Sequence, residues 1–194
     1  MPLNPTESLL AQLRSATTDL HHQLDRSLAF ESKPFTHKKY VAFLLGSLTA
    51  LEPLEAQLQP FFPADSLSRC ELLRQDLLSL GTPTAVHALA EAPAISTEAA
   101  AFGARYVIEG SALGGVVLAR AFDTALQLGG ESLHYLTLGT ARAGERWREF
   151  CLELERFGRM ATLSMQSEAC MSARAVFKLY AAAFRSTGAI TAIS

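Results

Sequence analysis

The chain has 194 residues, enough for one domain with a sizeable hydrophobic core. Its 17 basic and 19 acidic residues give a formal net charge of -2, which argues against the broad basic surface of a nucleic-acid-binding protein. Three widely spaced cysteines exclude a CxxC zinc pattern and favour a reducing cytoplasm. We find neither a signal-peptide pattern nor an apolar run of membrane-spanning length, so we expect a cytoplasmic protein without a membrane segment.

Leucine and alanine dominate, and alternating apolar and polar runs of strand type are scarce, so the pattern predicts an all-α fold. Turns are predicted where proline and glycine gather, and the tail after Ser186 is expected to be frayed. Pro53 is expected to kink the second helix or to mark its last turns. In chain order, helices are predicted from residue 6 or 8 to 29, from 36 through Pro53, and over 66–80, 85–91, 96–128 (bent), 141–163 and 167–185, with short structure near 131–138.

Two adjacent histidines lie in the first predicted helix. At about 100° per residue, the apolar positions from Leu13 to Leu28 share one arc of this helix, and His21 lies at its edge. His22 points about 100° further round, towards the polar face. His21 can therefore face a pocket as a neutral metal ligand, although a single such histidine is more often a core-edge residue bonded to a carbonyl group.

A glycine stripe marks the helix predicted near residue 110. Gly103, Gly110 and Gly114 follow one another at i, i+7 and i+11 and share a helix face. Each glycine inside a helix costs about 0.5–1 kcal/mol relative to alanine, so something must offset the stripe. A closely packed helix, a ligand or a bend would do so, and the stripe alone does not distinguish them. The spacing is not the G-x-G-x-x-G of a phosphate-binding loop.

Together these segments resemble the heme oxygenase family, especially its bacterial members. In the family's proximal helix an Ala-Thr pair precedes the ligand histidine, and Ala16-Thr17 in this chain points to His21. The run Tyr106 to Gly115 is similar to the family's distal helix in its Glu-Gly-Ser form, and residues 173–184 are similar to its last helix. The resemblance implies a multi-helical bundle with heme between the proximal helix and the glycine-rich distal helix.

The resemblance also implies a single domain over residues 1–194, with a core of about 7–186, and a role for individual residues. His21 would be the axial ligand of the heme iron, and Arg14 would pair with a heme propionate. Ordinary core packing for the aromatic residues and a solvated face for Arg14 remain the alternatives. The implied catalytic distal wall and remaining cofactor contacts are Gly110, Ser111, Gly114, Gly115, Tyr106, Phe177 and Tyr180.

One departure from the family pattern concerns the distal helix. Many members carry there a carboxylate that organises water, and the corresponding place in this chain is Ser111, as in bacterial relatives of the Glu-Gly-Ser form. Glu109 is two positions away on the helix and is expected to point elsewhere.

The activity implied by the resemblance is oxygen-dependent cleavage of heme b to biliverdin, with release of iron and carbon monoxide. Heme would be both substrate and prosthetic group, and a ferredoxin or a reductase would supply electrons. A bilin-using photoreceptor is one recipient that would fit the product. Histidine rather than thiolate is the fitting axial ligand for this chemistry.

Three other hypotheses stay open at this point. The protein could bind heme without degrading it, as a carrier or sensor, or share the fold without heme, as a thiamin-degrading type of enzyme or an interaction module. A di-iron bundle needs two Glu-x-x-His segments, and the sequence offers one, from Glu131 to His134.

Overall fold

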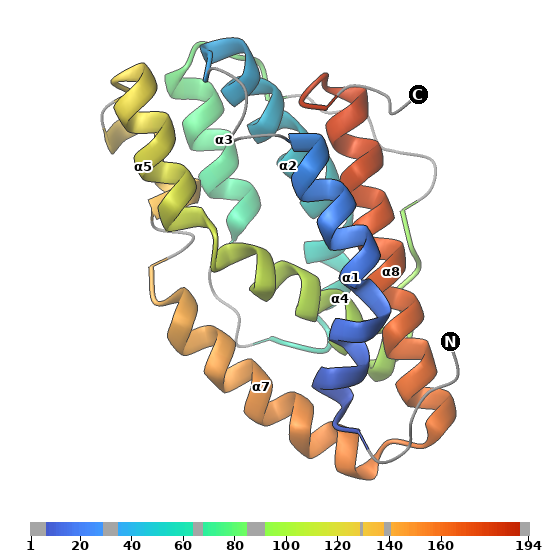
Figure 1. Cartoon of the computed structure of the whole chain (residues 1–194). Coiled ribbons are helices and arrows are strands. Elements are labelled where there is room, and N and C mark those ends of the chain that lie inside the picture. The colour runs from blue at the N-terminus through green and yellow to red at the C-terminus, as the bar shows by residue number, and fades with distance from the viewer. Residues whose placement is uncertain are drawn as a thin grey trace.

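The computed structural model describes residues 7–28, 35–63, 68–84, 92–128, 130–137 and 141–190. All regular structure in these ranges is helical, which confirms the predicted fold class (Figure 1). The helix predicted over residues 85–91 lies outside the described residues. The elements are α1 (Leu9–Leu28), α2 (His37–Leu58), α3 (Arg69–Ser79), α4 (Glu98–Ala112), α5 (Gly115–Leu126), the short 3-10 helix η1 (Gly130–Ser132), α6 (His134–Thr137), α7 (Ala143–Met160) and α8 (Leu163–Ser186).

Hydroxyl side chains define where several of these helices begin. The Ser8 hydroxyl accepts a hydrogen bond from the amide of Ala11 at the start of α1. Thr36 does the same for the amide of Lys39 in α2, as its predicted position required. Pro53 lies inside α2, which continues to Leu58.

Two predictions about the C-terminal part were wrong. The last helix begins at Leu163, four residues before the predicted start, because the Thr162 hydroxyl accepts from the amide of Met165 and caps it there. The chain after Ser186 does not fray over residues 187–190. The Thr187 hydroxyl donates to the carbonyl oxygen of Ala42 at 2.8 Å, and Ile190 is buried.

The bent helix predicted over residues 96–128 consists of α4 and α5, which run in different directions (Figure 1). The break falls at Leu113 and Gly114. There the amide of Leu113 donates to the carbonyl oxygen of Gly110, a tighter pairing than in an α-helix. The expected bend is therefore confirmed, and it lies within the glycine stripe.

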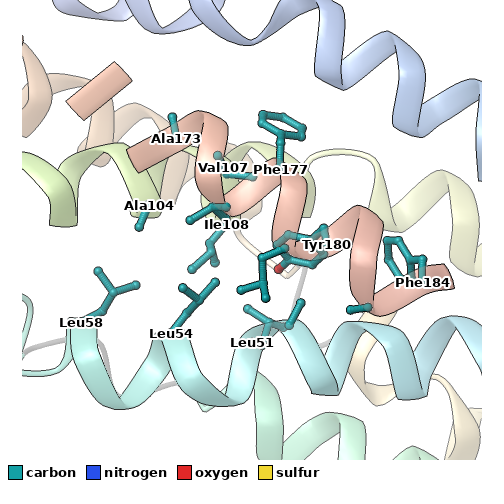
Figure 2. Close-up of a cluster of buried hydrophobic side chains, with 14 of the residues drawn as sticks. Leu51, Leu54, Leu58, Ala104, Val107, Ile108, Ala173, Phe177, Tyr180 and Phe184 are labelled. Carbon is teal, nitrogen blue, oxygen red and sulfur yellow. The ribbon is translucent and has the colours of Figure 1, made fainter. Parts of the chain in front are cut away.

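The hydrophobic core lies where α8 packs against α1, α2 and α4. Figure 2 shows leucines of α2 facing apolar residues of α4 and α8, with Phe177 directed away from those leucines. No helix in the described ranges is both long enough and apolar enough to cross a membrane. The labelled core residues are Leu51, Leu54, Leu58, Ala104, Val107, Ile108, Ala173, Phe177, Tyr180 and Phe184.

Candidate functional site

A cavity of about 1130 Å³ opens between α1, α4, α5 and α8, with α2, α3, α6 and α7 contributing to its wall. It is larger than the ~300–1,000 Å³ typical of small-molecule pockets. Most of its lining is apolar. Every candidate site residue from the sequence lies on this wall, namely Arg14, His21, Tyr106, Gly110, Ser111, Gly114, Gly115, Phe177 and Tyr180.

The two histidines of α1 differ as the helix geometry predicted. His21 lines the cavity, whereas His22 is exposed and does not. The His21 side chain is 58% exposed because the cavity is open beside it. Its ring packs edge-on against Phe177, with ring centres 5.8 Å apart, and its Nδ1 lies 3.3 Å from Oδ2 of Asp25. Phe177 and Asp25 thus restrict the orientation of the His21 ring.

The glycines of the stripe have two different surroundings, one at each end of the stripe. A Cβ atom on Gly103 would lie 2.0 Å from the carbonyl oxygen of Ala169, so this glycine permits close contact between α4 and α8. A Cβ atom on Gly110 would meet nothing closer than Trp147 at 3.6 Å, and one on Gly114 nothing closer than 3.9 Å. The stripe therefore serves helix packing at one end and lines the cavity at the other.

The two polar residues beside Gly110 point in different directions. Ser111 lies on the cavity wall, and its hydroxyl donates to the carbonyl oxygen of Ile108 at 2.8 Å. Glu109 is 1% exposed and lies behind the wall, as its helical position predicted. It accepts a hydrogen bond from Nη2 of Arg69 at 2.7 Å, and Nε of Arg146 lies 3.5 Å away. A carboxylate shared by two guanidinium groups is satisfied despite its burial.

A polar corner of the cavity contains one predicted residue, Tyr180, and three that the sequence analysis did not identify. It consists of Ser47, Arg69, Tyr135 and Tyr180, which come from α2, α3, α6 and α8. The buried Tyr180 hydroxyl has no hydrogen-bond partner among the residues that the structure describes. Burial raises the pKa of Tyr180 well above its usual value and that of Tyr135 to about 12, although Arg69 lowers both, so both phenols are neutral donors at physiological pH.

Basic side chains lie on the α1 side of the opening. Arg14 and Arg26 both line the cavity and are both exposed, and Arg26 was another residue that the sequence analysis did not identify. Cationic groups around an apolar cavity suit a large apolar ligand that carries carboxylates. Tyr106, which packs beside Trp147 with ring centres 5.9 Å apart, adds an aromatic wall.

The fold and the cavity define an all-helical ligand-binding protein that presents a histidine on one helix and an open glycine wall on others. Residues 7–186 match the family model described as heme oxygenase, and the chain belongs to the heme oxygenase family.

A curated protein and a solved structure are similar to this chain, the first in sequence and the second in fold. A heme oxygenase of Xanthomonas campestris pv. campestris (strain 8004) is 39% identical over 109 residues, which are 56% of this chain and 62% of that protein. The alignment thus spans less than two thirds of the Xanthomonas relative. The NO- and CO-bound heme oxygenase from Neisseria meningitidis has the same fold, with a TM-score of 0.73 at 24% identity, covering 96% of this chain and 95% of that one.

Proposed function

We propose that this protein is a heme oxygenase that cleaves heme b with molecular oxygen and external electrons, releasing biliverdin, iron and carbon monoxide. One observation carries the proposal: a single large cavity brings the histidine of α1 together with the open glycine wall of α4 and α5. Membership of the family supports heme as the ligand. When bound, heme would supply the iron at which oxygen is reduced.

His21 is the proposed axial ligand of the heme iron. With Asp25 on the Nδ1 side of the ring at 3.3 Å, the Nε2 lone pair remains available for a metal. A carboxylate next to a ligand imidazole fixes the ring orientation and increases its basicity. Phe177, which packs on the same imidazole, is proposed to lie against the heme as well.

The distal wall is proposed to be formed by Gly110, Ser111, Gly114 and Gly115. Because Gly110 and Gly114 line the cavity and carry no side chain, the helix backbone can lie close to a flat ligand there. The Tyr180 hydroxyl, which has no hydrogen-bond partner in the described part of the chain, could donate to a polar group or water in the cavity. Its buried position keeps that proton on the phenol.

Three further assignments belong to this proposal. Arg14 would pair with a heme propionate at the rim, and Tyr106 would contact the pocket edge. The whole chain would form one domain. Electrons would come from a ferredoxin or a reductase in the cytoplasm, and the product could serve a bilin-using photoreceptor; the free state of Cys70, Cys151 and Cys170 supports a reducing compartment.

A comparison of His21→Ala with His22→Ala tests the proposal. Both residues are exposed neighbours on α1, so the second variant is a matched control for the first. We expect hemin titration to give an intense Soret band with the unmodified protein and with His22→Ala, and loss of axial ligation with His21→Ala. Loss of axial ligation in His22→Ala, but not in His21→Ala, would contradict the assignment of His21 as the axial ligand.

Turnover distinguishes an oxygenase from a carrier or sensor. Hemin-loaded protein supplied with oxygen and ascorbate, or with a ferredoxin system, is expected to lose its Soret band as biliverdin absorption grows. A Soret band that persists under these conditions would favour a protein that binds heme without degrading it. Protein that shows no spectral change on hemin titration would exclude both functions.

A further inference from the structure

A cluster of possible metal ligands lies at the edge of the cavity. One ligand atom from each of His21, His22 and Asp25 lies within 4.8 Å of the other two, and all three residues are exposed. It is the one such cluster of histidine, cysteine and carboxylate side chains in the described ranges. The three residues lie on the same part of α1, so no movement between helices is needed to assemble them.

The sequence spacing explains why the three side chains converge. Asp25 is four residues after His21 and three after His22, the two spacings that place helix side chains next to each other. At about 100° per residue, Asp25 lies about 40° round the helix from His21 and about 60° from His22. The carboxylate thus lies between the two imidazoles, whose ring centres are 6.1 Å apart.

The donor set indicates the kind of cation that would bind. Two imidazoles and one carboxylate that leave coordination positions open are typical of ferrous iron and suit other first-row divalent ions. Asp25 contacts the His21 imidazole, and no salt bridge to a lysine or arginine of the described ranges competes for its carboxylate. Because His21 lines the cavity and His22 faces solvent, the cluster joins the cavity to the surface.

We propose that His21, His22 and Asp25 form a site for a first-row divalent cation in the heme-free protein. We assign to it the ferrous ion left when the porphyrin ring is opened. The site stands on the cluster geometry, and the identity of the ion rests on the proposed function. His21 would then serve twice: as the ligand of the heme iron, and as one of three ligands that hold the ion after the ring has opened.

Titration of the heme-free protein with Co²⁺, followed by visible absorption or calorimetry, tests the site. We expect one equivalent to bind, and His22→Ala to weaken binding at least about tenfold, since removal even of groups that orient metal ligands costs about 10–100-fold in affinity. His37→Ala, which removes another exposed histidine, is the control and should bind as the unmodified protein does. Absence of binding, or equal binding by both variants, would overturn the proposal.

The identity of the ion is tested by trapping ferrous iron with a chromogenic chelator during turnover. His22→Ala is expected to form biliverdin at the normal rate and to deliver iron to the chelator faster than the unmodified protein. Equal iron delivery would overturn the assignment of ferrous iron and leave the Co²⁺ site intact. Binding of Co²⁺ by a protein that binds no hemin would instead overturn the proposed function, and with it the assignment of ferrous iron, while the cation site itself would stand.

Discussion

The two ends of the glycine stripe give a matched pair of substitutions with opposite expected effects. In Gly103→Ala the new Cβ would lie 2.0 Å from the carbonyl oxygen of Ala169 and 3.0 Å from Cβ of Ser172. Neither contact can be relieved by a flexible side chain, so α4 and α8 must move apart. The same movement would stretch the hydrogen bond from the Ser172 hydroxyl to the carbonyl oxygen of Ala100, now 2.7 Å long.

Whether each alanine raises or lowers the unfolding free energy depends on the size of its steric cost relative to its gain in helix propensity. Overpacking costs about 1–3 kcal/mol and the stretched hydrogen bond about 0.5–1.5 kcal/mol, whereas the gain in helix propensity is only about 0.5–1 kcal/mol. Gly103→Ala is therefore expected to lower the unfolding free energy by about 0.5–4 kcal/mol. In Gly110→Ala the nearest atom is Trp147 at 3.6 Å, an ordinary contact, so the propensity gain remains and stability should rise slightly.

Urea unfolding of the heme-free variants measures both effects, and the melting temperature should change by about 2–4 °C for each kcal/mol. Hemin titration supplies the complementary readout, because the methyl group of Gly110→Ala enters the cavity and should weaken hemin binding. Gly103→Ala as stable as the unmodified protein would refute the close-contact argument. Equal destabilisation by the two alanines would show that the division of the stripe is wrong.

Other variants test the buried polar groups and the helix caps. Glu109→Ala leaves Arg69 buried without its carboxylate and is expected to cost about 3–5 kcal/mol in urea unfolding; a loss below about 1 kcal/mol would contradict the pairing. Burial raises the pKa of Tyr180 in the folded protein, whereas in the unfolded chain it has the ordinary tyrosine value of about 10. Above pH 10 the unfolded chain therefore loses this proton more readily than the folded protein, and the unfolding free energy should fall as the pH rises further. Tyr180→Phe should make this alkaline decline less steep without loss of stability at pH 7, because the hydroxyl that it removes has no hydrogen-bond partner within the described ranges. Thr36→Ala should cost about 0.5–2 kcal/mol by removing the cap on the Lys39 amide, and an unchanged melting temperature would contradict that role.

Local signals made the helices and the cavity wall predictable from the sequence. The leucine period of α1 separated His21 from His22, and the glycine stripe marked the bend between α4 and α5. Contacts between residues far apart in the sequence could not be predicted from local patterns. Residues 187–190 have no helical period, and they are held in place because the Thr187 hydroxyl donates to a carbonyl oxygen of α2, 145 residues earlier in the chain. Their predicted fraying failed for that reason.

The polar corner could not be predicted for a related reason, and Arg69 illustrates it. Arg69 and Glu109 are 40 residues apart, and neither position stands out in a helical pattern. Helix geometry predicts that Glu109 points away from the cavity. That its partner Arg69 lines the cavity follows only from the packing of α3 against its neighbours. Two consecutive residues of α4 thus lie on opposite sides of the wall: Gly110 lines the cavity, and Glu109 pairs from behind with the Arg69 guanidinium. Glu109 therefore does not take the place of a carboxylate at Ser111: its charge is paired with Arg69 and Arg146, and the group that reaches the cavity wall is the Arg69 guanidinium.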